Sequence, residues 1–311
     1  MTNAPINTTR RLTFRLAAAL AGLSLLSAGP AHAAETKTAS APQAQALKLQ
    51  PYNAGAKGLF PVASVLIEGR RDAILVDAQF GRAQAEELVQ KIRDSGKRLT
   101  TIYISHGDPD YYFGLETIHA AFPEVKILAT APTIAHIKET RAAKLAFWGP
   151  KMGADAPGAT IVPQALKGDH LTLEGKRLQI IGLKGPQPDR TVLWIPSIKA
   201  VVGGILVNGN RHVWVADTQS LQSRKDWLAG LARIEQLKPE IVIPGHYAEG
   251  APLNLQSVKF TEDYLKAFDE ENARTANSAE LIEAMKKRFP DAGPTSSLEL
   301  SAKVIKGEMK W

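Results

Sequence analysis

A short polar segment, residues 105–114, carries the side chains of this sequence that are best suited to chemistry. It reads Ser-His-Gly-Asp-Pro-Asp-Tyr-Tyr-Phe-Gly and directly follows a β-rich run at 99–104. In extended backbone, residues two apart point the same way, so His106, Asp108 and Asp110 are expected to converge on one side. One imidazole and two carboxylates at a strand end suit a divalent cation. A plain polar turn would have the same composition, because Gly, Asp and Pro are also turn residues.

The elements around that segment predict mixed α/β layers. Two β-rich runs at 62–68 and 73–76 flank a charged turn, which is typical of a hairpin. Apolar residues at helical spacing follow at 83–93, and strands then alternate with helices in both halves of the chain. This order favours sheets covered by helices. The further helices expected are 115–121, 132–145, 222–237, 258–273 and 279–289, and the further strands are 125–129, 171–173, 178–183, 191–195, 199–202 and 240–244.

The polar segment resembles the ligand loop of the metallo-β-lactamase superfamily, whose pattern is H-x-H-x-D-H with a glycine after a short spacer. Here the pattern is H-x-D-x-D-Y, with Gly114 downstream. Other similarities follow in the family's order over 58–250: Asp77 at the end of Ile-Leu-Val-Asp, the stretch 201–217, and the ending Val-Ile-Pro-Gly-His at 242–246. This resemblance implies an α/β fold, the four-layer αβ/βα sandwich of the metallo-β-lactamase type.

The resemblance also implies a metal site with fewer ligands than the family pattern. Carried over position by position, the retained ligands are His106, Asp108, Asp110 and His246, with an aspartate in place of the second histidine. The loop's last histidine, the third histidine and the bridging aspartate are lost, and become Tyr111, Pro186 and Gly204. Two imidazoles and two carboxylates suffice for one divalent ion and are a poor set for two. Zinc remains possible, while the carboxylates move the preference toward Fe²⁺ or Mn²⁺.

Further side chains are expected to act around these ligands. Asp110 is expected to orient the attacking water or to accept its proton, and Tyr111 to donate a hydrogen bond to a substrate oxygen or simply to pack. Side chains expected behind the ligands or in the pocket wall are Asp77, Tyr112, His212 and Asp217. The spacing leaves open whether Asp189, His212 or Asp217 supplies a missing ligand. The other histidines, His119, His136 and His170, are predicted to be structural, because nothing with ligand spacing surrounds them.

Other kinds of chemistry have no motif behind them. The 311 residues include no cysteine, which excludes disulfides, iron–sulfur clusters, thiolate zinc sites and cysteine nucleophiles. No Gly-x-Ser-x-Gly, Walker or dinucleotide motif occurs. The resemblance and its retained ligand positions imply, as the leading hypothesis, a hydrolase in which a metal-activated water attacks an ester, lactone, amide or similar bond of a small-molecule substrate. The lost ligand positions favour an alternative, a non-catalytic periplasmic binding or accessory protein that kept the fold.

The first residues have the layout of a cleavable export signal. Three arginines precede an apolar run at 16–28, and Ala-His-Ala at 31–33 supplies the cleavage pattern. The run is short for a membrane span. We therefore expect a periplasmic or secreted protein without membrane insertion after cleavage. The segments predicted are a signal peptide at 1–33, a flexible lead-in at 34–50, a metallo-β-lactamase-like domain at 51–255 and a C-terminal helical extension packed on it at 256–311.

The charge of the chain gives no indication of a nucleic-acid partner. The formal net charge is +7, and removing residues 1–33 takes away three arginines and no acidic residue, which leaves +4. No block of Lys and Arg with interleaved aromatic residues appears. The sequence does not indicate an oligomeric state.

Overall fold

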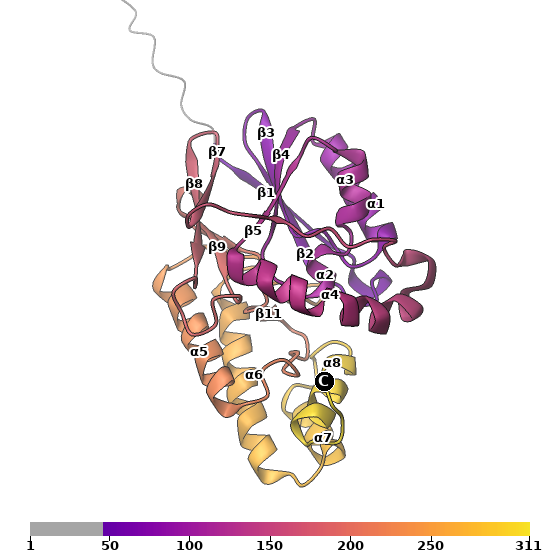
Figure 1. Ribbon diagram of the computed structural model, residues 1–311. Coiled ribbons are helices and arrows are strands. Elements are labelled where there is room, and N and C mark those ends of the chain that lie inside the picture. Colours follow the sequence, from indigo (N-terminus) through magenta and orange to yellow (C-terminus); the bar gives the residue numbers. More distant parts are fainter. Residues whose placement is uncertain (1–45) are drawn as a thin grey trace, which may run out of the picture. The chain divides into compact units, whose positions relative to one another are not determined.

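Two β-sheets lie face to face in the computed structural model, which describes residues 46–311 (Figure 1). The first has the order β1 (Lys48–Asn53), β2 (Ala63–Glu68), β3 (Asp72–Val76), β4 (Arg98–Ile104), β5 (Lys126–Ala129) and β6 (Gln164–Ala165). The second has the order β12 (Ile241–Val242), β10 (Ala200–Val202), β9 (Val192–Ile195), β8 (Lys176–Ile181) and β7 (His170–Leu173). A short parallel pair, β11 (Asn208–Gly209) and β13 (His246–Tyr247), lies apart from them.

Successive side chains of a strand point to opposite faces of its sheet. Each sheet can therefore pack on the other sheet through one face and on helices through the other. In β3, Ile74 and Val76 belong to the core between the sheets, whereas Ala73 and Leu75 belong to the core on the opposite face. Strands that are buried on both faces consist almost wholly of apolar residues. This accounts for the continuous Ala-Ile-Leu-Val run of the strand.

Helices cover the outer face of each sheet. The first sheet packs on α1 (Arg82–Asp94), α3 (Leu115–Ala121) and α4 (Ala131–Met152). Behind the second sheet lie α5 (Leu221–Gln236) and α6 (Leu255–Arg274), as Figure 1 shows, and α7 (Ser278–Arg288) and α8 (Ser296–Ile305) extend the same apolar core beyond α6. The order helices, sheet, sheet, helices confirms the four-layer αβ/βα sandwich expected from the sequence.

Several elements differ from the sequence-based expectations. Residues 109–112 form a helical turn, α2 (Pro109–Tyr112), because Pro109 at its first position presets a helical φ angle. The strand β1 begins at Lys48, so residues 48–50 pair with β2 and do not belong to the lead-in expected at 34–50. The helix α4 continues to Met152, and α8 was not among the helices specified, although it lies within the helical extension predicted at 256–311.

The predicted signal peptide and most of the predicted lead-in fall within residues 1–45, which lie outside the described residues. Among the helices of residues 46–311, none combines the length and the apolar character that a bilayer span requires.

Candidate active site

Asp77, which follows β3, holds together the loops that carry the candidate ligands. Its Oδ1 accepts a hydrogen bond from the backbone N–H of Ser105 at 2.8 Å, and its Oδ2 accepts one from Ser105 Oγ at 2.6 Å. Ser105 Oγ in turn accepts a hydrogen bond from the backbone N–H of Gly204 at 2.7 Å. Asp77 therefore fixes the start of the polar segment, His106 onward, against the loop after β10.

His106 and Asp108 form the first pair of candidate ligands. The distance from His106 Nε2 to Asp108 Oδ2 is 3.2 Å, and His106 Nδ1 lies 3.4 Å from the Asp189 carbonyl oxygen. The imidazole of His136 fills the space beside Gly107, which lies between them. A Cβ at this position would lie 2.4 Å from His136 Cδ2. The helical turn α2 begins directly after Asp108, so Asp110 does not lie in the extended backbone that was expected, but Asp108 and Asp110 still line the same cavity.

His246 and Asp110 form the second pair. His246 Nδ1 lies 2.8 Å from the Pro61 carbonyl oxygen, so this nitrogen carries the proton of the neutral ring and Nε2 presents its lone pair. His246 Nε2 faces Asp110 Oδ2 at 3.3 Å and the Tyr111 hydroxyl at 3.3 Å. Burial lowers the pKa of His246 to about 4, which keeps the ring neutral near neutral pH. Tyr111 also donates a weak hydrogen bond to the Gly204 carbonyl oxygen at 3.4 Å.

The structure thus brings the candidate ligands together as pairs. Within residues 46–311, no three His, Asp or Glu side chains lie together in an arrangement that could hold a metal ion. The chemistry of the donor set nevertheless fits a cation. Asp110 Oδ2 is buried and has no hydrogen-bond partner among the described residues, although it faces the Nε2 lone pair of His246. Each imidazole is oriented through Nδ1 by a backbone carbonyl, as metal-ligating histidines commonly are.

The lost bridging position is closed to any side chain. Gly204 has a φ of +76°, and a Cβ there would lie 2.0 Å from the Thr191 carbonyl oxygen. An aspartate at this position would require a shift of the backbone.

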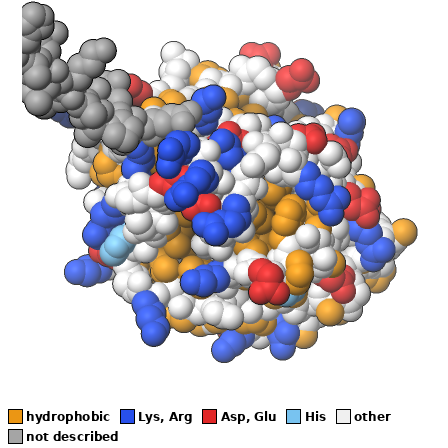
Figure 2. All heavy atoms as spheres, turned by 90° about the horizontal axis from the view of Figure 1, so that it is seen from above, with side chains coloured by type: hydrophobic (Ala, Val, Ile, Leu, Met, Phe, Trp, Pro, Cys, Tyr) orange, Lys and Arg blue, Asp and Glu red, His pale blue; other side chains and the backbone are white. Residues whose placement is uncertain are grey.

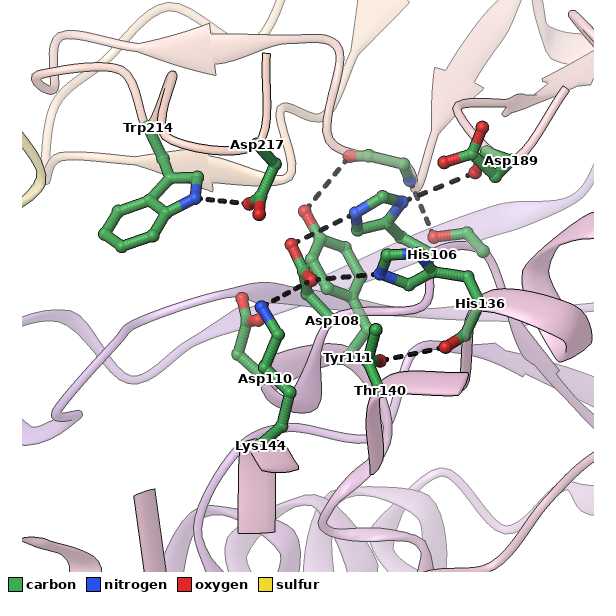
Figure 3. Close-up of polar contacts among 12 residues, drawn as sticks. His106, Asp108, Asp110, Tyr111, His136, Thr140, Lys144, Asp189, Trp214 and Asp217 are labelled. Carbon is green, nitrogen blue, oxygen red and sulfur yellow. Dashed lines mark hydrogen bonds and ion pairs between the residues drawn. The ribbon is translucent and has the colours of Figure 1, made fainter. Parts of the chain in front are cut away.

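Two side chains of α4 that the sequence did not assign to the site contact Asp108. His136 Nε2 lies 3.6 Å and Lys144 Nζ 3.5 Å from Asp108 Oδ1 (Figure 3). The prediction that His136 is structural overlooked this contact. His136, Thr140 and Lys144 recur every four residues and so share one helix face. That polar stripe is the signal that would have identified them.

The two aspartates of the site differ in their ionisation. Burial disfavours the charge on Asp108, but His106, His136 and Lys144 outweigh it and hold its pKa well below the usual range. Burial and the charge of Asp108 raise the pKa of Asp110 well above the usual range. The hydrogen bond to Asp108 raises the pKa of His136. The site therefore contains one firmly ionised carboxylate beside one that retains a proton more readily.

A small cavity of about 30 Å³ adjoins these residues. It has room for a water molecule. Its polar lining comes from Asp108, Asp110, Lys144 and His246, and its apolar lining from Phe60, Phe80, Pro109, Trp148, Ile205, Trp214 and Trp311.

The remaining side chains that were expected near the ligands differ in whether they contribute to the cavity. Asp217 accepts hydrogen bonds from Trp214 Nε1 at 2.5 Å and from Trp311 Nε1 at 2.7 Å, and so supports the cavity wall. His212 instead pairs through Nδ1 with the Tyr264 hydroxyl at 3.0 Å. The buried hydroxyl of Tyr112 has no hydrogen-bond partner within residues 46–311. Neither His212 nor Tyr112 lines the cavity.

A sequence model described as the metallo-β-lactamase superfamily matches residues 58–246. The chain belongs to the metallo-β-lactamase superfamily. Members of this superfamily usually bind divalent metals, and membership indicates a metal-dependent hydrolase in general terms. No curated protein matches the sequence.

Solved structures of metallo-β-lactamase type share the fold. A metallo-β-lactamase from Pontibacter korlensis is 18% identical, with a TM-score of 0.53 over 73% of this chain and 97% of that one. A metallo-β-lactamase family protein from Thermus thermophilus is 18% identical, with a TM-score of 0.58 over 85% of this chain and 93% of that one. A β-lactamase domain protein from Burkholderia ambifaria is 15% identical, with a TM-score of 0.59 over 84% of each chain.

Proposed function

We propose that this member of the metallo-β-lactamase superfamily is a hydrolase that cleaves an ester, lactone, amide or similar bond of a small molecule. One observation supports the proposal most. Asp110 Oδ2 is buried, lacks a hydrogen-bond partner within residues 46–311 and faces His246 Nε2 beside a cavity with room for a water. We further propose that one divalent ion, zinc, iron or manganese, is held by His106, Asp108, Asp110 and His246. When bound, such an ion supplies Lewis acidity for the carbonyl and the water.

The residues of the chain have separate tasks in this proposal. Asp110 orients the attacking water by accepting its hydrogen bond and receives its proton. The water oxygen bonds to the carbonyl carbon, the bond from that carbon to the leaving group breaks, and the proton passes to the leaving group. Tyr111 does not line the cavity, and we assign its hydroxyl the task of orienting His246, which it contacts at 3.3 Å.

Metal analysis of the purified protein, combined with turnover of an ester, lactone and β-lactam panel, tests this proposal. We expect close to one ion per chain, and we expect His106→Ala to lose both the ion and the activity because it removes a nitrogen ligand. His170→Ala is the matched control, since His170 lies at the surface on β7 and pairs with Asp169. A protein that binds no metal and turns over no substrate after metal supplementation would refute the hydrolase.

A second candidate function is ligand binding without catalysis. It is favoured by the absence, within residues 46–311, of a group of three side chains placed to hold a metal. In that case a ligand-induced rise in melting temperature should survive both chelation and His106→Ala. Loss of function in a folded His106→Ala variant would exclude it.

We also propose that the protein is exported to the periplasm or secreted. The proposal is supported by the arginines, apolar run and Ala-His-Ala pattern of residues 1–33. Amino-terminal sequencing of protein from the exported fraction should begin at Ala34. Full-length protein retained in the cytoplasm would contradict export.

A further inference from the structure

The cavity beside the His/Asp pairs has room for a water molecule and little more. Asp108, Asp110 and His246, which carry the chemistry proposed above, line its volume of about 30 Å³. An ester or an amide is several times larger than a water, so it cannot occupy this cavity while the walls stay in place. The proposed hydrolysis therefore needs a wall that moves.

Most of the aromatic rings in the cavity wall are firmly held. Phe80 is buried in the core of the first sheet, and Phe60 and Trp148 pack against that core. Trp214 is buried as well and donates a hydrogen bond from Nε1 to Asp217 Oδ2. Moving one of these rings would expose apolar surface that the fold keeps from water, which is unfavourable.

The ring of Trp311 is held less firmly. It is partly exposed, and it packs against a small cluster of Trp214, Ala216 and Val304 that is separate from the cores of the two sheets. Within residues 46–311 its indole makes one hydrogen bond, from Nε1 to Asp217 Oδ1 at 2.7 Å. Displacing this ring would therefore leave the main cores intact.

The backbone that leads to Trp311 is anchored up to Met309. The N–H of Met309 donates a hydrogen bond to the Lys303 carbonyl oxygen of α8 at 3.2 Å. No hydrogen bond within residues 46–311 involves the backbone of Lys310 or Trp311. The indole can thus swing about these last residues while α8 stays where it is.

Trp311 bridges two sides of the cavity. On the side of α4, its ring meets Phe147 edge-on, with centroids 5.5 Å apart, and lies 4.7 Å from the ammonium of Lys144. On the side of the segment after β11, it meets Trp214 with centroids 5.1 Å apart. Because Lys144 is paired with Asp108 at 3.5 Å, the indole covers an ion pair and not a free charge. Figure 3 shows this pair directed toward Asp110.

We propose that Trp311 is a gate over the candidate active site, and that a substrate reaches Asp110 and His246 only when this indole swings away. In the closed position the gate leaves room for the attacking water. In the open position the cavity gains the volume of the indole, which makes space for a carbonyl group. The word substrate rests on the proposed function, whereas the closure of the cavity by Trp311 does not.

Chemical modification of His246 tests the gate without a metal or a substrate. Diethylpyrocarbonate carbethoxylates neutral imidazoles and is larger than water, so it should reach His246 slowly while the gate is closed. With the purified full chain in a chelator, the rate at His246 should rise about tenfold or more in Trp311→Ala. Peptide mass spectrometry measures this rate. His170, whose side chain is 37% exposed on β7, should react equally fast in both proteins.

Two further variants make the test specific. Lys310→Ala is the matched control, because Lys310 is the exposed neighbour of Trp311 and should leave the rate at His246 unchanged. Trp311→Phe keeps a ring but loses the bond to Asp217, so its rate should lie between those of the wild type and Trp311→Ala. Circular dichroism establishes that each variant is folded, and Trp311→Phe replaces Trp311→Ala if the latter is not.

The outcomes separate the gate from the proposed hydrolase. An unchanged rate at His246 in the Trp311 variants would overturn the gate, even in a protein that turns over esters, and would leave the hydrolase intact. An equal rise in Lys310→Ala, or a parallel rise at His170, would also overturn it, because the whole fold would then have loosened. A rise confined to His246 and to the Trp311 variants, in a protein without turnover, would support the gate and count against the hydrolase.

Discussion

The site depends on a single buried carboxylate, that of Asp77, which is not itself a candidate ligand. Asp77 has a φ of +64° and accepts both the N–H and the hydroxyl hydrogen bonds of Ser105. A residue with a side chain rarely adopts this conformation unless the surrounding structure enforces it. The bonds to Ser105 provide that enforcement, and they fix the backbone from which His106 follows.

Asp77 also makes stability depend on pH. Burial raises its pKa from 3.8 to about 7, with the Ser105 hydrogen bonds opposing the shift. The folded state therefore holds this proton more tightly than the unfolded chain, and the contribution of Asp77 to stability falls as pH rises from about 4 to about 7. As pH rises through this range, the melting temperature of the wild type should fall relative to that of Asp77→Asn. A constant difference would contradict the prediction, and Asp291→Asn, at an exposed carboxylate, is the control.

At the scale of elements, a local signal in the sequence located the start of α7. Asn277 and Glu280 predict a capping box, and Asn277 Oδ1 accepts a hydrogen bond from the Glu280 N–H at 3.0 Å at the start of α7. Asn277→Ala should lower the free energy of unfolding by about 1 kcal/mol, because it leaves that N–H without its cap. Urea denaturation measures the change. Glu283→Ala, an exposed substitution within the same helix, should cost clearly less.

Only the site residues that lie within a sequence motif could be predicted from the sequence. The pattern around His106 and Asp110 and the Pro-Gly-His ending at His246 identified one side of the cavity, because a ligand loop is local in sequence. His136 and Lys144 form an equally regular stripe, but nothing in the sequence says which neighbour that helix face meets. The contact of Trp311 with Lys144 likewise joins residues far apart in the chain, and only the packing of the layers brings them together.

At the scale of the whole described chain, surface charge is mixed. On the face drawn in Figure 2, Lys and Arg side chains surround a patch of hydrophobic side chains, with Asp and Glu among them. The expectation of a small-molecule rather than a nucleic-acid partner remains a prediction. Salt-dependent retention of the protein on immobilised duplex DNA would contradict it, since binding to phosphates weakens steeply with salt.

The helices after residue 255 share one core with the second sheet. Phe268 of α6 is fully buried in the same cluster as Trp227 of α5 and Val201 of β10. Residues 256–311, expected from the sequence as an extension, should therefore unfold together with 51–255 in one cooperative transition. Phe268→Ala should lower the free energy of unfolding by about 3–5 kcal/mol, because it opens a cavity in that shared core.

Chemical denaturation followed by tryptophan fluorescence and by circular dichroism measures both effects, because tryptophans lie in the first-sheet core and in the second. The two signals should coincide in the wild type and shift together in Phe268→Ala. Leu221→Ala is the control, since Leu221 is 51% exposed on α5 and its loss should cost little. Separate transitions, with helical signal lost before fluorescence changes, would show that 256–311 folds as a unit of its own.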